Sequence, residues 1–119
     1  MEHLKLFDAE YRVMRLIWDN EPINSTELVR LCSDELGWKK STTYTMLKRL
    51  SERGIVKNEN TFVEALIKRE QVQKFESETV LEKTFAGSLP SFITAFLSDK
   101  TLSKEEAEEI IKLIVEATK

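Results

Sequence analysis

GWKKSTTYTMLKRLSERG, which runs from Gly37 to Gly54, has the pattern of an amphipathic helix. At about 100° per residue, Thr43, Met46 and Leu50 fall on one arc with Leu47 at its centre. The other face and its flanks hold hydroxyl groups, one aromatic ring and cations: Ser41, Thr42, Tyr44, Thr45, Lys48 and Arg49, preceded by Lys39 and Lys40. Gly54 is the residue type that ends helices in the left-handed conformation, so we expect the helix to stop there.

The polar face of this helix has the chemistry needed to read DNA. Serine and threonine can donate to phosphate oxygens or touch base edges, and lysine and arginine can reach phosphate or guanine. A basic helix is more often simply a solvated surface helix. Hydroxyl residues at a helix start, however, are a poor choice for helix stability alone. We therefore predict DNA contacts from Lys39, Lys40, Ser41, Thr42, Tyr44, Thr45, Lys48 and Arg49.

Two helices are expected before this stretch. The first begins with Asp8 as its N-cap, carries a buried stripe through Ile17, and is broken at Glu21-Pro22. The second is capped by Asn24 and ends at Gly37, and the single cysteine within it, Cys32, is predicted to pack as a small hydrophobe. Together with the stretch from Gly37 to Gly54, these helices predict a helix-turn-helix.

The residues after Gly54 predict a β-hairpin. Ile55 to Lys57 has the pattern of a strand, residues 58–60 that of a turn, and residues 61–67 that of a returning strand. A hairpin directly behind a DNA-reading helix is a wing. Its predicted tip contains Glu59, where a phosphate-contacting cation would be expected, so the wing either touches little DNA or has another partner.

From about residue 69 the pattern becomes helical again, with breaks at Gly87 and before a cap at Ser103. About fifty residues are too few to bury this much apolar surface alone, so the surface either folds back on the first part or meets a second copy. We favour the second copy and predict a homodimer interface formed by Phe85, Leu89, Phe92, Ile93, Phe96, Ile110, Ile111 and Ile114. The expected fold is mainly α: a winged helix-turn-helix DNA-binding domain, residues 1–69, and a helical dimerisation domain, residues 70–119.

Composition narrows the class of protein. The 119 residues are 41% hydrophobic and 33% charged, with no membrane-length apolar run and no signal-peptide pattern at the start, so we expect a cytoplasmic protein that does not insert into a membrane. His3 is the only histidine, and one cysteine cannot form an internal disulfide. We therefore expect no catalytic residues, no metal site, no cofactor and no enzyme activity.

Charge is distributed unevenly along the chain. Residues 1–57 carry ten Lys or Arg against nine Asp or Glu, whereas residues 58–119 carry eight against twelve. Within residues 37–57 six cations face one acid, Glu52. Local cations matter more than the net charge of −3, because the salt dependence of DNA binding depends on the cations that meet phosphates.

Several of these motifs resemble the penicillinase repressors of the BlaI/MecI type, along nearly the whole chain. The motifs are Ala9-Glu10-Tyr11-Arg12-Val13-Met14 with Ile17-Trp18, Trp38, Thr42 to Leu50, Gly54, Ser91-Phe92 with Phe96, and Leu102-Ser103. The resemblance implies a homodimeric, sequence-specific winged-helix repressor of β-lactam resistance or related operons, which binds a palindromic operator. It also implies a sensor-linked protease as a partner.

The chain departs from that family at the site of regulatory cleavage. The β-lactam-responsive members are cut between an asparagine and a phenylalanine, and the matching positions here are Ala95 and Phe96. We therefore expect the bond between them to survive that protease. The rival hypothesis is a winged-helix protein-interaction module that binds no specific operator, but such a module has no reason to carry the basic face of residues 37–57.

Overall fold

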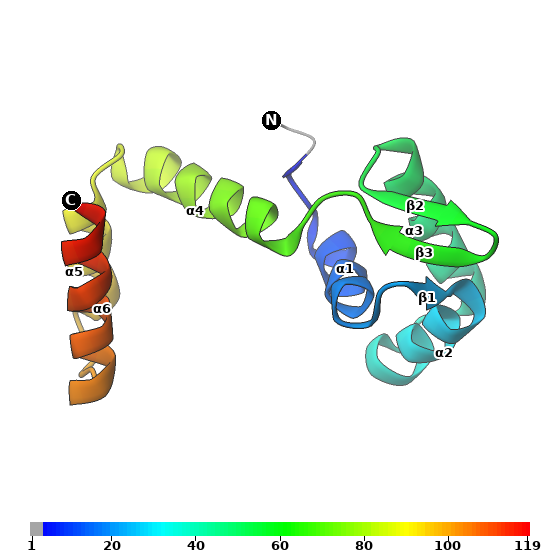
Figure 1. Cartoon of the computed structure of the whole chain (residues 1–119), viewed down its shortest axis with the longest axis horizontal. Helices are drawn as coiled ribbons and strands as arrows, with labels where there is room; N and C mark the ends of the chain where they lie inside the picture. The colour runs from blue at the N-terminus through cyan, green and yellow to red at the C-terminus, as the bar shows by residue number, and fades with distance from the viewer. Residues whose placement is uncertain (1–3) are drawn as a thin grey trace. The chain divides into compact units, whose positions relative to one another are not determined.

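A computed structural model describes residues 4–119 and forms two compact units, which meet in sequence between Thr79 and Val80 (Figure 1). The elements are α1 (Asp8–Asn20), β1 (Ile23–Asn24), α2 (Ser25–Leu36), α3 (Lys40–Glu52), β2 (Val56–Glu59), β3 (Phe62–Ala65), α4 (Arg69–Phe85), α5 (Leu89–Leu97) and α6 (Lys104–Ala117). The predicted fold class, a mainly α winged helix followed by a helical part, is confirmed.

The division between the units falls inside α4, whereas the change in sequence pattern placed the domain boundary at residue 69. Val72, in the first turn of α4, is fully buried, so the start of this helix belongs to the first unit. None of the helices between residues 4 and 119 combines the length and apolar character needed to cross a membrane.

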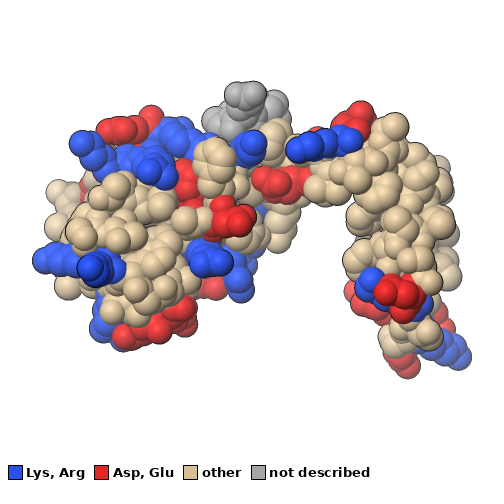
Figure 2. Space-filling model, turned by 180° about the vertical axis from the view of Figure 1, so that it is seen from behind, with Lys and Arg blue, Asp and Glu red and all other residues tan. Residues whose placement is uncertain are grey.

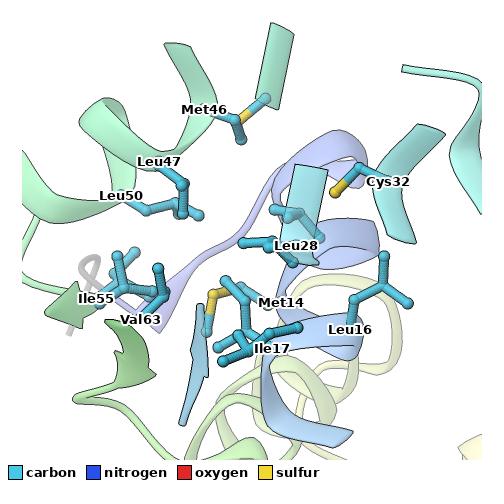
Figure 3. Close-up of a cluster of buried hydrophobic side chains, with 13 residues drawn as sticks. Met14, Leu16, Ile17, Leu28, Cys32, Met46, Leu47, Leu50, Ile55 and Val63 are labelled. Atoms are coloured by element: carbon cyan, nitrogen blue, oxygen red, sulfur yellow. The ribbon is translucent and has the colours of Figure 1, made fainter. Parts of the chain in front are cut away.

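One hydrophobic core holds the first unit together (Figure 3). Leu47 and Leu50 of α3 point toward Ile55 and Val63 of the hairpin, while Leu28 of α2 lies between α3 and α1. The other members are Val13, Met14, Leu16, Ile17, Ile23, Cys32, Met46 and Val56. The apolar face predicted for the Gly37 to Gly54 helix is therefore the face that packs.

The first two helices begin in different ways. The prediction that Asp8 caps α1 is wrong: Phe7 is the extended N-cap residue and Asp8 is already helical. Glu10 supplies the capping contact instead, because its Oε1 accepts a hydrogen bond from the Phe7 N–H at 2.9 Å. The prediction for α2 is confirmed, since the Asn24 Oδ1 accepts from the Thr26 N–H at 2.9 Å.

The wing is a three-stranded antiparallel sheet in the order β1-β3-β2. The predicted turn over residues 58–60 is wrong, because Glu59 pairs with Phe62 across the hairpin. The turn is Asn60-Thr61, with φ of 52° and 67°, and two positive φ values are what a tight two-residue hairpin turn requires. Sequence patterns did not reveal β1, because two residues are too short to show alternation.

The second unit contains the end of α4 and the helices α5 and α6. The predicted cap at Ser103 is confirmed, because its Oγ accepts from the Glu106 N–H at 3.1 Å. The Ser88 Oγ caps α5 in the same way by accepting from the Ser91 N–H at 3.1 Å. Within this unit the ring of Phe92 lies 5.3 Å from that of Phe85, measured between centroids. No residue between 80 and 119 is buried, so the unit has no hydrophobic core of its own.

Candidate nucleic-acid interface

The outward face of α3, together with its N-cap residue Lys39, carries every residue for which DNA contacts were predicted. The four buried residues of the helix, Thr43, Met46, Leu47 and Leu50, all lie on the opposite face. As a result the eight predicted side chains are all exposed: Lys39, Lys40, Ser41, Thr42, Tyr44, Thr45, Lys48 and Arg49. The Lys40 Nζ lies 5.9 Å from the centroid of the Tyr44 ring, which places a cation and an aromatic side by side at the helix start.

The cations on α3 are not neutralised by neighbouring carboxylates. In the part of the chain that the structure describes, none of the cations Lys39, Lys40, Lys48 and Arg49 takes part in an ion pair. An unpaired surface cation can replace the counterions condensed on DNA without first breaking a salt bridge. The cations on this face of α3 can therefore contact phosphate groups without losing an existing ion pair.

Two of the six cations counted between residues 37 and 57 already have partners. Arg53 is paired with Glu10, and the Lys57 Nζ lies 3.7 Å from Glu59 and 3.4 Å from Glu64. No spacing rule could reveal the first pair, because its members are 43 positions apart in sequence. Among the described residues, the other four cations of this stretch therefore have no ion-pair partner.

Arg30, the cation of α2, is paired with two acids of the same helix, Glu27 and Asp34. A hydrogen bond from Arg30 holds the pKa of the Glu27 carboxyl below its usual range, and the same bond raises the pKa of the Arg30 guanidinium. The Arg30 Nη1 also donates to Asp34 at 3.2 Å. Between Ser25 and Glu52, the cations without an ion pair among the described residues therefore lie on α3 and at its N-cap.

The contact between α2 and α3 is uncharged. Burial raises the pKa of the Cys32 thiol, which keeps it protonated, and its contact with Thr43 opposes this shift by less. The buried Thr43 hydroxyl contacts this thiol, a weak donor, and has no conventional hydrogen-bond partner among the described residues. Cys32 behaves here as the small hydrophobe that the sequence predicted.

The two ends of α3 are built differently. At the C-terminal end Gly54 adopts φ of 74°, the Gly54 N–H donates to Ser51 O at 3.0 Å, and the Ile55 N–H donates to Leu50 O at 2.9 Å. These two backbone hydrogen bonds end the helix and direct the chain into the wing. At the N-terminal end the Lys39 side chain makes no capping bond and the first turn has no acid. The free N–H groups and the positive end of the helix dipole there favour an anion, a feature that sequence reasoning missed.

The wing contributes little positive charge. Lys57 is flanked by Glu59 and Glu64, and the side chain of Glu59 is 69% exposed. The turn is also held in place, because the Ser25 N–H donates to Thr61 O at 2.7 Å and the Asn24 Nδ2 donates to the Thr61 hydroxyl at 3.1 Å. Positive charge therefore comes from α3 rather than from the hairpin.

The second unit presents an apolar surface, and Figure 2 shows a face of it that is mostly uncharged. Six of the predicted interface residues are exposed, and Phe85 and Phe92 are half-buried; the exposed six are Leu89, Ile93, Phe96, Ile110, Ile111 and Ile114. Leu113 and Val115 are exposed as well, at 65% and 52%. The prediction omitted these two because it followed a single stripe along α6, whereas the exposed apolar surface is wider.

Comparison with known proteins covers both units. The sequence profile described as penicillinase repressor matches residues 6–116. The chain belongs to the penicillinase repressor family. A penicillinase repressor of Bacillus licheniformis is 31% identical to it over 116 residues, covering 94% of this chain and 91% of the relative. One from Staphylococcus aureus is 26% identical over 115 residues, covering 93% and 91%. The resemblance drawn from the sequence motifs is thereby confirmed.

The bond between Ala95 and Phe96, which matches the cleavage position named above, lies in α5. Both residues are exposed, and the side chain of Phe96 is covered on one side by Lys100, whose Nζ lies 4.7 Å from the ring centroid. The same Nζ donates to the Phe96 carbonyl at 3.1 Å. The bond thus lies on the surface of a regular helix.

Proposed function

We propose that this chain is a transcriptional repressor that binds operator DNA as a homodimer and acts in the cytoplasm, where it blocks transcription by occupying the operator. The observation that carries the proposal is the exposed face of α3 and its N-cap, where four cations that form no ion pair with any described residue surround a strip of hydroxyl groups. Hydroxyl groups and cations on one helix face suit simultaneous contacts to base edges and phosphates in a major groove. The names of its relatives, which are penicillinase repressors, support the same activity.

The exposed apolar surface of the second unit supports the proposal of a dimer. Helices with no buried residue, and with side chains such as Ile111 and Leu113 largely exposed, are not stable as an isolated layer in water. Covering them with the same helices of a second copy buries both surfaces at once by two-fold symmetry. A symmetric dimer carries two α3 helices, so its operator is a palindrome with two half-sites.

Selection of bound sequences from a random duplex pool, followed by titration at several salt concentrations, tests the proposal. We expect a palindromic consensus. If all four cations of each protomer meet phosphates, the slope of log affinity against log salt is about −7, since each contact contributes roughly −0.9. Absence of any enriched sequence would contradict operator recognition and favour a protein partner for this fold.

The bond between Ala95 and Phe96 provides a separate prediction about regulation. Incubation with an activated sensor protease of a family relative should leave this bond intact, because alanine replaces the asparagine cut in the β-lactam-responsive members. Mass spectrometry of the products measures this directly. Ala95→Asn is the matched variant and should become cleavable, since the residue is exposed. A cut in the wild-type chain would show that asparagine is not required.

A further inference from the structure

Glu10 is a charged residue with no exposed surface in the core-facing side of α1. The Arg53 Nη1 donates to both of its carboxylate oxygens at 2.7 Å, and the Phe7 N–H donates to one of them at 2.9 Å. A buried carboxylate is strongly unfavourable unless it is paired and hydrogen-bonded in this way. The position of Glu10 therefore depends on Arg53.

Arg53 is the C-cap residue of α3, and its side chain is 27% exposed. Its Nη2 donates to Lys5 O at 2.5 Å, so one guanidinium joins the segment before α1, α1 itself and the end of α3. The planar guanidinium offers donors in fixed directions, and these directions are set by Glu10 and Lys5. Arg53 thus holds the C-terminal end of α3 at one place against α1.

This arrangement separates Arg53 from the other cations of the segment. Lys48 and Arg49 are exposed and unpaired among the described residues, whereas both terminal nitrogens of Arg53 donate to protein oxygens. To read a base, each α3 side chain must be placed within roughly 0.5 Å of its correct position on the base edge. This placement depends on how the helix is held against the rest of the domain. A residue that anchors the helix end can therefore control DNA affinity without touching DNA.

We propose that Arg53 is a positioning residue for the α3 helix, that it acts through Glu10, and that it contacts no phosphate. The inference rests on the proposed function. It predicts a signature opposite to that of a contact residue: loss of Arg53 lowers operator affinity and leaves the number of ions released on binding unchanged. A purely structural residue would lower the melting temperature and leave the affinity of the folded protein unchanged.

The experiment compares four full-length variants with the wild type on the selected operator: Arg53→Met, Arg53→Lys, Glu10→Gln, and the double variant Glu10→Gln with Arg53→Met. Binding is measured at several salt concentrations, at a temperature where circular dichroism shows each variant to be folded. For Arg53→Met we expect affinity at least about tenfold lower with an unchanged salt slope. Arg53→Lys should retain part of the affinity, because lysine keeps the positive charge but cannot donate to Glu10 and to the Lys5 carbonyl in the fixed directions of a guanidinium. Arg49→Ala, on the exposed face of the same helix, is the matched control and should reduce the slope.

The double variant tests whether Arg53 acts through Glu10. If it does, the two losses are not additive and the double variant binds about as well as Arg53→Met. Because the double variant replaces both charged residues by neutral ones, it leaves no unpaired charge in the core. Its affinity can therefore still be measured if one of the single variants fails to fold. Unchanged affinity in the folded double variant, additive losses, or a slope reduced as in Arg49→Ala would each overturn the inference. If the wild-type chain selects no DNA sequence, the proposed function fails, and this inference fails with it.

Discussion

Replacing both Lys48 and Arg49 with alanine is expected to lower operator affinity by about 100-fold or more and to flatten its salt dependence. Both side chains are exposed on α3 and form no ion pair among the described residues. In a dimer the change removes four cations, and removal of each cation that meets a phosphate reduces the salt slope by roughly 0.9. Filter binding or fluorescence anisotropy at several salt concentrations measures both quantities, and the fold should be unaffected because neither side chain is in the core.

The control for this experiment is Arg12 and Arg15 replaced together by alanine. These arginines are exposed on α1 and, like the α3 pair, are found in no ion pair within residues 4–119. The change in net charge is identical, so a general electrostatic effect would appear in both variants. Wild-type affinity in the α3 variant, or equal losses in the two variants, would contradict the assignment of α3 as the DNA-reading helix.

Phe92→Asp is expected to convert the proposed dimer into monomers. The ring of Phe92 lies 5.3 Å from Phe85 and 6.0 Å from Phe96, so it is central to the aromatic cluster of the second unit. A carboxylate there would have to be desolvated without a partner when the two apolar surfaces meet, which costs several kcal/mol and raises the dimer dissociation constant by about 1,000-fold or more. Sedimentation equilibrium over a range of concentrations measures the dissociation constant.

Thr94→Asp is the control for the dimer experiment, because Thr94 is exposed on the same helix and lies outside the predicted interface. We expect it to remain a dimer. The Phe92 variant should also lose most of its operator affinity, since a monomer meets only one half-site. A dimer that persists in this variant would place the interface on another surface of the chain.

Much of this protein could be predicted from spacing along the chain. The two faces of α3 follow from the positions of Thr43, Met46, Leu47 and Leu50, because side chains three or four residues apart share one side of a helix. The closure of α3 at Gly54 and the cap at Ser103 are equally local, since each depends on residues within one helical turn.

Three features that spacing could not predict depend on contacts between distant segments. Strand β1 exists because Ile23 pairs with Val63, and the hairpin turns at Asn60-Thr61 because Thr61 is bonded to the start of α2. Arg53 belongs by sequence to the basic stretch, yet folding places its guanidinium on a buried carboxylate 43 positions away. Helical periodicity thus predicts which residues face outward from α3, and the folded chain decides which of the nearby cations remain free, because an ion pair depends on distance in space and not along the sequence.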